Sequence, residues 1–158
     1  MQIPTRFGEA AEKVLETARE ILPDAIISVG QAGGRKGITP EVVAINLQEA
    51  SISDNAGQQP TDTPVVAHGP AAYFSTLPVR HMVESIKETG IPSYLSFSAG
   101  AFVCNDVMYT LLHHFRETKV QCGFIHVPFL PEQAKENVPS LSLDEMVKGI
   151  TAAIAALE

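Results

Sequence analysis

The sequence of 158 residues contains no tryptophan, only two cysteines and few aromatic side chains. Its longest apolar stretches fall far short of the roughly 20 residues that a membrane-spanning helix requires. The chain has no lysine- or arginine-rich run and its net charge is −7, so we expect neither a nucleic-acid partner nor an anionic membrane surface. The N-terminal stretch becomes charged within a few residues, unlike a secretory signal peptide. These absences predict a globular, cytoplasmic protein.

The two cysteines, Cys104 and Cys122, could form one disulfide at most. In a reducing compartment this favours a thiol function or plain burial over a disulfide framework. The composition, 45% hydrophobic and 18% charged, is typical of a folded chain, and the length predicts one domain over residues 1–158.

The apolar pattern alternates between helical and strand periods along the chain. It predicts helices at about 7–22, 78–89, 103–115 and 142–157, and strands at 25–30, 41–47, 93–98 and 121–129. Residues 31–40 are predicted to form a glycine-rich loop, and residues 48–64 a long surface loop. Alternating strands and helices predict an α/β fold with a largely parallel sheet, whose active site would lie at the carboxyl ends of the strands.

Cys104 follows the predicted strand 93–98 and the small-residue turn "SAGA", so it lies near the first turn of a helix. A helix N-terminus lowers the pKa of a thiol from its free value of about 8.5, whereas Asp106 two residues on would raise it. A neighbouring imidazolium of His126 would decide this balance. Free cysteines are also among the residues most often buried, so a core role stays open.

His126 alternates with Ile125 and Val127, which places its side chain on the same strand face as Phe124. Glu41 begins the apolar run "EVVAIN". A cysteine, a histidine and an acid are the minimal set for nucleophilic acyl transfer, because the base activates the thiol and the acid orients the imidazole. A structural histidine and a solvated edge carboxylate are the alternatives.

Two other site classes fit the sequence less well. Cys104, Cys122 and His126 lack the paired spacing of zinc ligands, so no metal is predicted. The loop "GQAGGR" matches neither common phosphate-binding pattern, so no nucleotide cofactor is predicted.

Five motifs in order resemble the pyroglutamyl peptidase type I (pyrrolidone-carboxylate peptidase) family, and the resemblance runs through almost the whole chain. They are "GQAGGR", "ITPEVVAIN", "DNAGQQP", "AGAFVCNDVMY" and "GFIHVPF". The resemblance implies a cytosolic cysteine peptidase that removes an N-terminal pyroglutamyl residue from peptides. It also implies a three-layer α/β/α sandwich around a twisted, mostly parallel mixed sheet, and a homo-oligomer, either a dimer or a tetramer.

The same resemblance assigns roles to individual residues. It implies a catalytic triad of Glu41, Cys104 and His126, and it matches Gln31 to a position that holds the pyroglutamyl lactam. Arg35 is either a helper at the oxyanion or a structural partner for a carboxylate, and both readings stay open.

Two departures from the family pattern accompany the match. Met1 aligns downstream of the family's first strand and "GFxPFGG"-like loop, which implies that roughly a quarter of a usual member is absent. Ser51 stands where many relatives carry arginine. The alternatives to an active peptidase are an inactive truncated or divergent relative that acts as a binding protein, and another cysteine hydrolase on a related scaffold.

Overall fold

The computed structural model describes residues 1–157. Its helices are α1 (Glu9–Ile21), α2 (Val79–Glu88), α3 (Val103–Phe115) and α4 (Leu143–Ala155). Its strands are β1 (Ala25–Gln31), β2 (Thr39–Pro40), β3 (Val43–Ile45), β4 (Ala72–Phe74) and β5 (Gln121–Val127). All four predicted helices are present to within a few residues at each end, and α4 begins with the expected capping box, in which Ser142 and Glu145 bond each other reciprocally.

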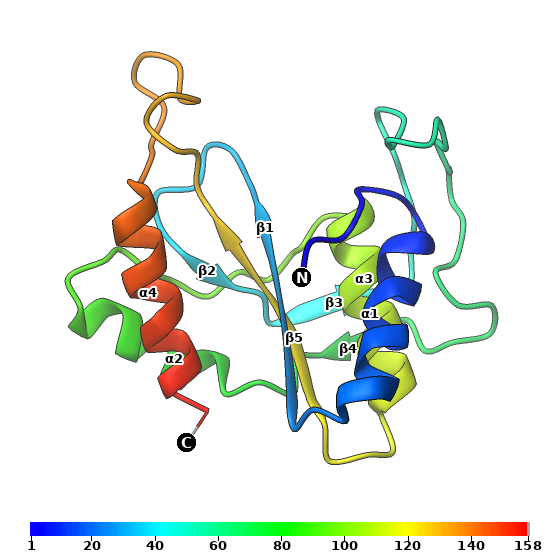
Figure 1. Cartoon of the computed structure of the whole chain (residues 1–158). Coiled ribbons are helices and arrows are strands. Elements are labelled where there is room, and N and C mark those ends of the chain that lie inside the picture. The colour runs from blue at the N-terminus through cyan, green and yellow to red at the C-terminus, as the bar shows by residue number, and fades with distance from the viewer. Residues whose placement is uncertain (158) are drawn as a thin grey trace.

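The helices form two layers with the sheet between them. Helices α1 and α3 cover one face, and α2 and α4 cover the other (Figure 1). The main sheet has the order β1-β5-β2, with β1 parallel and β2 antiparallel to β5, while β3 and β4 pair separately as a two-stranded antiparallel sheet. The predicted α/β class, the three layers and the mixed sheet are confirmed. Parallel pairing is confined to β1 with β5 and to isolated bridges.

Strand β5 separates the two hydrophobic cores because its side chains alternate between the faces of the sheet. Cys122 and Phe124 pack against α1 and α3, whereas Ile125 packs with α2 and α4. Residues 122–126 are all buried, as expected for a strand covered on both faces. His126 therefore faces the α3 side, where Cys104 also lies.

Several strand predictions were wrong in detail. Residues 93–98 make only isolated bridges, Ile38 with Ser93 and Glu41 with Ser96, because Pro40 has no N–H to continue the ladder. The predicted run 41–47 shortens to β3, and β2 lies inside the predicted glycine-rich loop. Strand β1 is only partly covered: Ser28 is buried, whereas Val29 is 49% exposed.

The predicted surface loop 48–64 contains no helix or strand, and it extends away from the layers beside α1 (Figure 1). Its base is closed by two backbone hydrogen bonds between Gln48 and Thr63, at 2.7 and 3.2 Å. No helix among residues 1–157 is long and apolar enough to cross a membrane.

The first turn of α3 is fixed by two buried polar side chains. Asn105 accepts from the Ile45 N–H at 2.9 Å and donates to the carbonyls of Ile45 and Leu47 at 2.9 and 3.0 Å. The Asp106 carboxylate accepts from the Gly8 N–H at 2.9 Å and from Gln48 Nε2 at 2.6 Å. These contacts hold the helix start against β3 and against the N-terminus of α1, so the adjacent residue Cys104 has a fixed position.

The Asn105→Ala substitution tests this arrangement. It removes the side-chain partner of three partly buried backbone groups, of which the Ile45 carbonyl keeps the Leu47 N–H, so we expect the free energy of unfolding in urea to fall by about 2 kcal/mol. The matched control is Asn55→Ala at an exposed loop position, with an expected change within about 0.5 kcal/mol. A loss below about 1 kcal/mol at Asn105 would contradict the role given to this side chain.

Candidate active site

A buried hydrogen bond joins Glu41 to His126. Nδ1 of His126 lies 2.6 Å from Oε1 of Glu41, and the side chains are 4% and 0% exposed. Main-chain pairing brings them together, because Thr39 and Pro40 of β2 lie opposite His126 and Ile125, and the Glu41 N–H donates to the Phe124 carbonyl at 2.9 Å. With Nδ1 held by the carboxylate, Nε2 is the imidazole nitrogen left for proton transfer.

Arg35 approaches the same carboxylate from the glycine-rich loop. Its Nη2 lies 2.8 Å from Glu41 Oε1, and its Nη1 donates to Thr39 Oγ1 at 2.5 Å. The Thr39 hydroxyl in turn donates to the His126 carbonyl at 3.3 Å. Nη2 also donates to the Ser98 carbonyl at 3.4 Å, in the turn that leads to Cys104. Arg35 therefore contacts the Glu41 carboxylate, the Thr39 hydroxyl beside it and the turn before Cys104.

Cys104 lies in the first turn of α3, as predicted. Gly100 takes a left-handed conformation (φ 78°) that few other residues adopt, and Phe102 is extended and begins the helix. This turn places the Cys104 sulfur against the main chain of β1: a Cβ added to Gly30 would lie 3.2 Å from Sγ and 2.8 Å from the Phe124 ring.

Cys104 and His126 are neighbours through Phe124. The Phe124 and His126 rings are 4.7 Å apart between centroids, which confirms that they share a strand face. No hydrogen bond joins the Cys104 thiol to His126 within residues 1–157. Glu41 and His126 are thus in direct contact, whereas Cys104 lies near His126 without a hydrogen bond to it.

The opposing influences on the Cys104 thiol resolve toward a higher pKa, because burial outweighs the effect of the helix N-terminus. The pKa of Cys104 is raised to about 11, first by burial and then by the charge of Glu41, and Arg35 together with the cysteine's own N–H opposes this only in part. Asp106, which the sequence suggested as an opposing charge, instead bonds Gly8 and Gln48. The resting side chain is therefore a thiol, and it needs a base to become a nucleophile.

A cavity of about 350 Å³ opens beside the Cys104 sulfur. Its apolar lining includes Ile3, Pro4, Val29, Phe102, Val107 and Phe124. Gln31 lines the same cavity, and its Nε2 donates to Gln133 Oε1 at 2.6 Å. The cavity thus combines an apolar wall, one primary amide and the thiol, which suits a small, uncharged and partly polar group.

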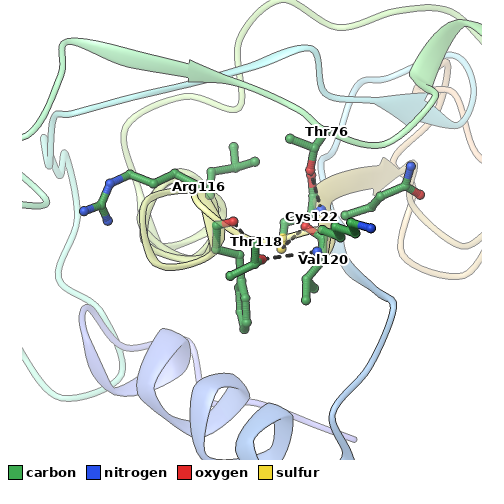
Figure 2. Close-up of a pocket in the computed structure, with 9 residues that line it drawn as sticks. Thr76, Arg116, Thr118, Val120 and Cys122 are labelled. Atoms are coloured by element: carbon green, nitrogen blue, oxygen red, sulfur yellow. Dashed lines mark hydrogen bonds between the residues drawn. The ribbon is translucent and has the colours of Figure 1, made fainter.

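Cys122 belongs to a different cavity, of about 210 Å³, at the other end of β5 (Figure 2). The Cys122 N–H donates to Thr76 Oγ1 at 2.7 Å, and burial raises the pKa of its thiol to about 12. Figure 2 shows the Arg116 side chain directed away from Cys122. Both cysteines are free, and Cys122 packs as a core residue.

Sequence reasoning missed several residues of the site. Thr39 was placed in a loop although it is fully buried under Arg35, and Gly30 and Phe124 were not singled out although both pack at the thiol. A glycine at the carboxyl end of a strand, next to the glutamine of "GQAGGR", was the one available signal for Gly30. Within residues 1–157, no group of three or more His, Cys, Asp or Glu side chains could hold a metal ion.

Comparison with known proteins gives one answer by three routes. The family model for pyroglutamyl peptidase matches residues 1–158. Pyrrolidone-carboxylate peptidase of Levilactobacillus brevis is 51% identical over 99% of this chain and 79% of its own length. Pyrrolidone-carboxylate peptidase 1 of Caldanaerobacter subterraneus subsp. tengcongensis is 48% identical with the same two coverages.

Solved structures agree with the sequence relatives. Pyroglutamyl peptidase I from Bacillus amyloliquefaciens superposes with a TM-score of 0.96 at 45% identity, over 99% of this chain and 76% of that one. A mutant pyrrolidone carboxyl peptidase from the hyperthermophile Pyrococcus furiosus gives 0.93 at 40% identity, over 98% and 78%. From its sequence, its fold and its relatives, this chain belongs to the pyroglutamyl peptidase family.

Proposed function

We propose that this chain is a cysteine peptidase that hydrolyses the amide bond after an N-terminal pyroglutamyl residue, with Cys104 as nucleophile, His126 as base and Glu41 as orienting acid. The observation that carries the proposal is the buried 2.6 Å contact between His126 Nδ1 and Glu41 Oε1, on the face of the sheet against which Cys104 of α3 packs. Family membership supplies the substrate class: peptides that begin with pyroglutamate.

The high pKa of the Cys104 thiol determines how the first step proceeds. His126 Nε2 removes the thiol proton as sulfur forms its bond to the pyroglutamyl carbonyl carbon, and the imidazolium is stabilised by Glu41. The carbonyl oxygen becomes an oxyanion near the free N–H groups that begin α3, where backbone donors and the helix dipole stabilise negative charge.

Collapse of the tetrahedral intermediate completes the cycle. The C–N bond breaks, His126 gives its proton to the leaving amine, and the pyroglutamyl group stays on sulfur as a thioester. Water, deprotonated by His126, then attacks the thioester and releases pyroglutamate, and the proton returns to the Cys104 thiol.

The composition of the cavity supports the choice of substrate. Pyroglutamate has no free α-amino group, so its recognition needs an apolar wall and a partner for the lactam rather than a carboxylate for an ammonium. Gln31 can donate to the lactam C=O and accept from its N–H, and the apolar lining suits the ring. Ser51 is an exposed loop residue outside this cavity lining. Arg35 fits the carboxylate-partner reading, because its contacts are to Glu41, Thr39 and Ser98.

A cytoplasmic location, a dimeric or tetrameric assembly and one domain over residues 1–158 stay predictions. The inactive-relative alternative differs from the proposal in one measurable property, which is cysteine-dependent turnover.

Release of a chromogenic amine from a pyroglutamyl amide tests the nucleophile. We expect turnover by the unaltered chain, loss of it to the background rate in Cys104→Ala, and near-normal turnover in Cys122→Ala, because Cys122 lies outside the site. Undiminished turnover by Cys104→Ala would contradict the proposal. A folded but inactive unaltered chain would identify an inactive member of the family.

Glu41→Gln tests the orienting acid. The amide can keep a contact to His126 but cannot stabilise an imidazolium, so we expect kcat to fall on the order of 10²–10⁴-fold with KM little changed. A loss confined to KM would assign Glu41 to substrate binding instead. Circular dichroism on the same sample checks that the fold persists.

The pH dependence of Cys104 alkylation by iodoacetamide tests the thiol. A pKa near 11 means that the thiolate fraction, and with it the rate, rises about tenfold per pH unit from pH 7 to 9 without a plateau. Mass spectrometry of the native Cys104→Ala chain gives the contribution of Cys122, which we expect to be negligible. A plateau below pH 8 would show a thiolate already present at neutral pH.

A further inference from the structure

The two carboxylate oxygens of Glu41 have different surroundings. Both polar contacts of its side chain use Oε1, one from His126 at 2.6 Å and one from Arg35 at 2.8 Å. Oε2 is buried and, within residues 1–157, has no hydrogen-bond partner. A fully buried carboxylate needs compensation of its charge, and Arg35 is the partner that carries a permanent positive charge.

The guanidinium of Arg35 is held from several sides. Nη1 donates to Thr39 Oγ1, and Nη2 also reaches the Ser98 carbonyl at 3.4 Å. Its side chain is only 19% exposed, so solvent screens its charge weakly. Arg35 therefore connects Glu41, Thr39 of β2 and the turn before α3. It does not line the cavity beside Cys104.

We infer that Arg35 is a positioning residue that balances Glu41, so that the carboxylate orients His126 without suppressing ionisation of the Cys104 thiol. The inference rests on the proposed function, which gives these three groups their roles. A bare carboxylate would favour the imidazolium but would oppose the developing thiolate through space. An adjacent guanidinium offsets part of that field at the sulfur, while the short contact to His126 is kept.

The opposing effects of the two charges on Cys104 agree with this arrangement. The charge of Glu41 raises the thiol pKa, and the charge of Arg35 lowers it. The contacts of Arg35 also argue against a direct role at the oxyanion, because its terminal nitrogens already bond Glu41, Thr39 and Ser98.

Alkylation of Cys104 by iodoacetamide at pH 8, followed by mass spectrometry, tests the inference without any substrate. In Arg35→Gln the uncompensated carboxylate raises the thiol pKa, and we expect alkylation about tenfold slower than in the unaltered chain. Arg35→Lys retains the charge and should stay within about threefold of the unaltered rate. Arg19→Gln removes an equal charge from an exposed pair with Glu12 on α1 and should change nothing.

The double variant Arg35→Gln/Glu41→Gln separates charge balance from simple structural support. Removing both charges restores neutrality, so its alkylation rate should return to within about threefold of the unaltered chain, although Arg35→Gln alone is slow. It also serves if Arg35→Gln fails to fold, because it leaves no buried charge unpaired. Equal rates in the unaltered chain and Arg35→Gln would overturn the inference, as would a double variant slower than either single one.

Kinetics on the pyroglutamyl amide supply an independent measurement. Arg35 does not line the cavity, so Arg35→Gln should lower kcat with KM within about twofold, and Arg35→Lys should recover most of kcat. A change confined to KM would place Arg35 in substrate binding and overturn the inference. If no variant of the chain turns over substrate, the alkylation series still decides the inference, and the proposed function alone fails.

Discussion

The short contact between Glu41 and His126 is the interaction on which the site depends, and it constrains the fold around it. A carboxylate can be fully buried only beside partners that offset its charge. The two-residue strand β2 meets this need: pairing with the end of β5 sets Glu41 beside His126, and the loop before β2 returns Arg35 to the same oxygen. Pairing with β5 continues past Pro40 through the Glu41 N–H, which donates to the Phe124 carbonyl, so this short strand fixes the main chain of Glu41 itself.

The position of Cys104 depends on a second set of constraints. Asn105 and Asp106 use the first turn of α3 to bond main-chain groups of distant segments, so the helix start is held by its polar side chains as well as by its apolar face. Gly30 lets β1 approach the sulfur and Phe124 closely. The thiol is consequently well placed, and the partial burial that orders it also raises its pKa. Partial burial therefore both orders the Cys104 side chain and makes its reactivity depend on proton removal by His126.

The sequence alone was sufficient for features that depend on periodicity. Helical spacing and the Ser142–Glu145 capping box predicted α4, and strand alternation placed His126 on the face of Phe124. Strand β2 was missed because two residues carry no period, and Arg35 could not be paired with Glu41 because loop geometry brings them together. The direction of the Cys104 pKa could not be decided from the sequence, since helix position is local whereas burial is tertiary. The residues themselves left several roles open for Cys104 and His126, and the family resemblance chose among them.

The placement of the two cysteines has a consequence for oxidative damage. Cys104 Sγ lies beside Gly30, which is paired with His126 of β5. Cys122 lies on the same strand four residues before His126, which is about 13 Å along the strand. Disulfides require Cα atoms within about 7 Å, so a bond between these two would need movement of the main chain. If Cys104 is oxidised to a sulfenic acid, the other thiol of this sequence, Cys122, is too far along β5 to resolve it. Recovery then depends on a small thiol from outside, which couples the state of this residue to the redox condition of its surroundings.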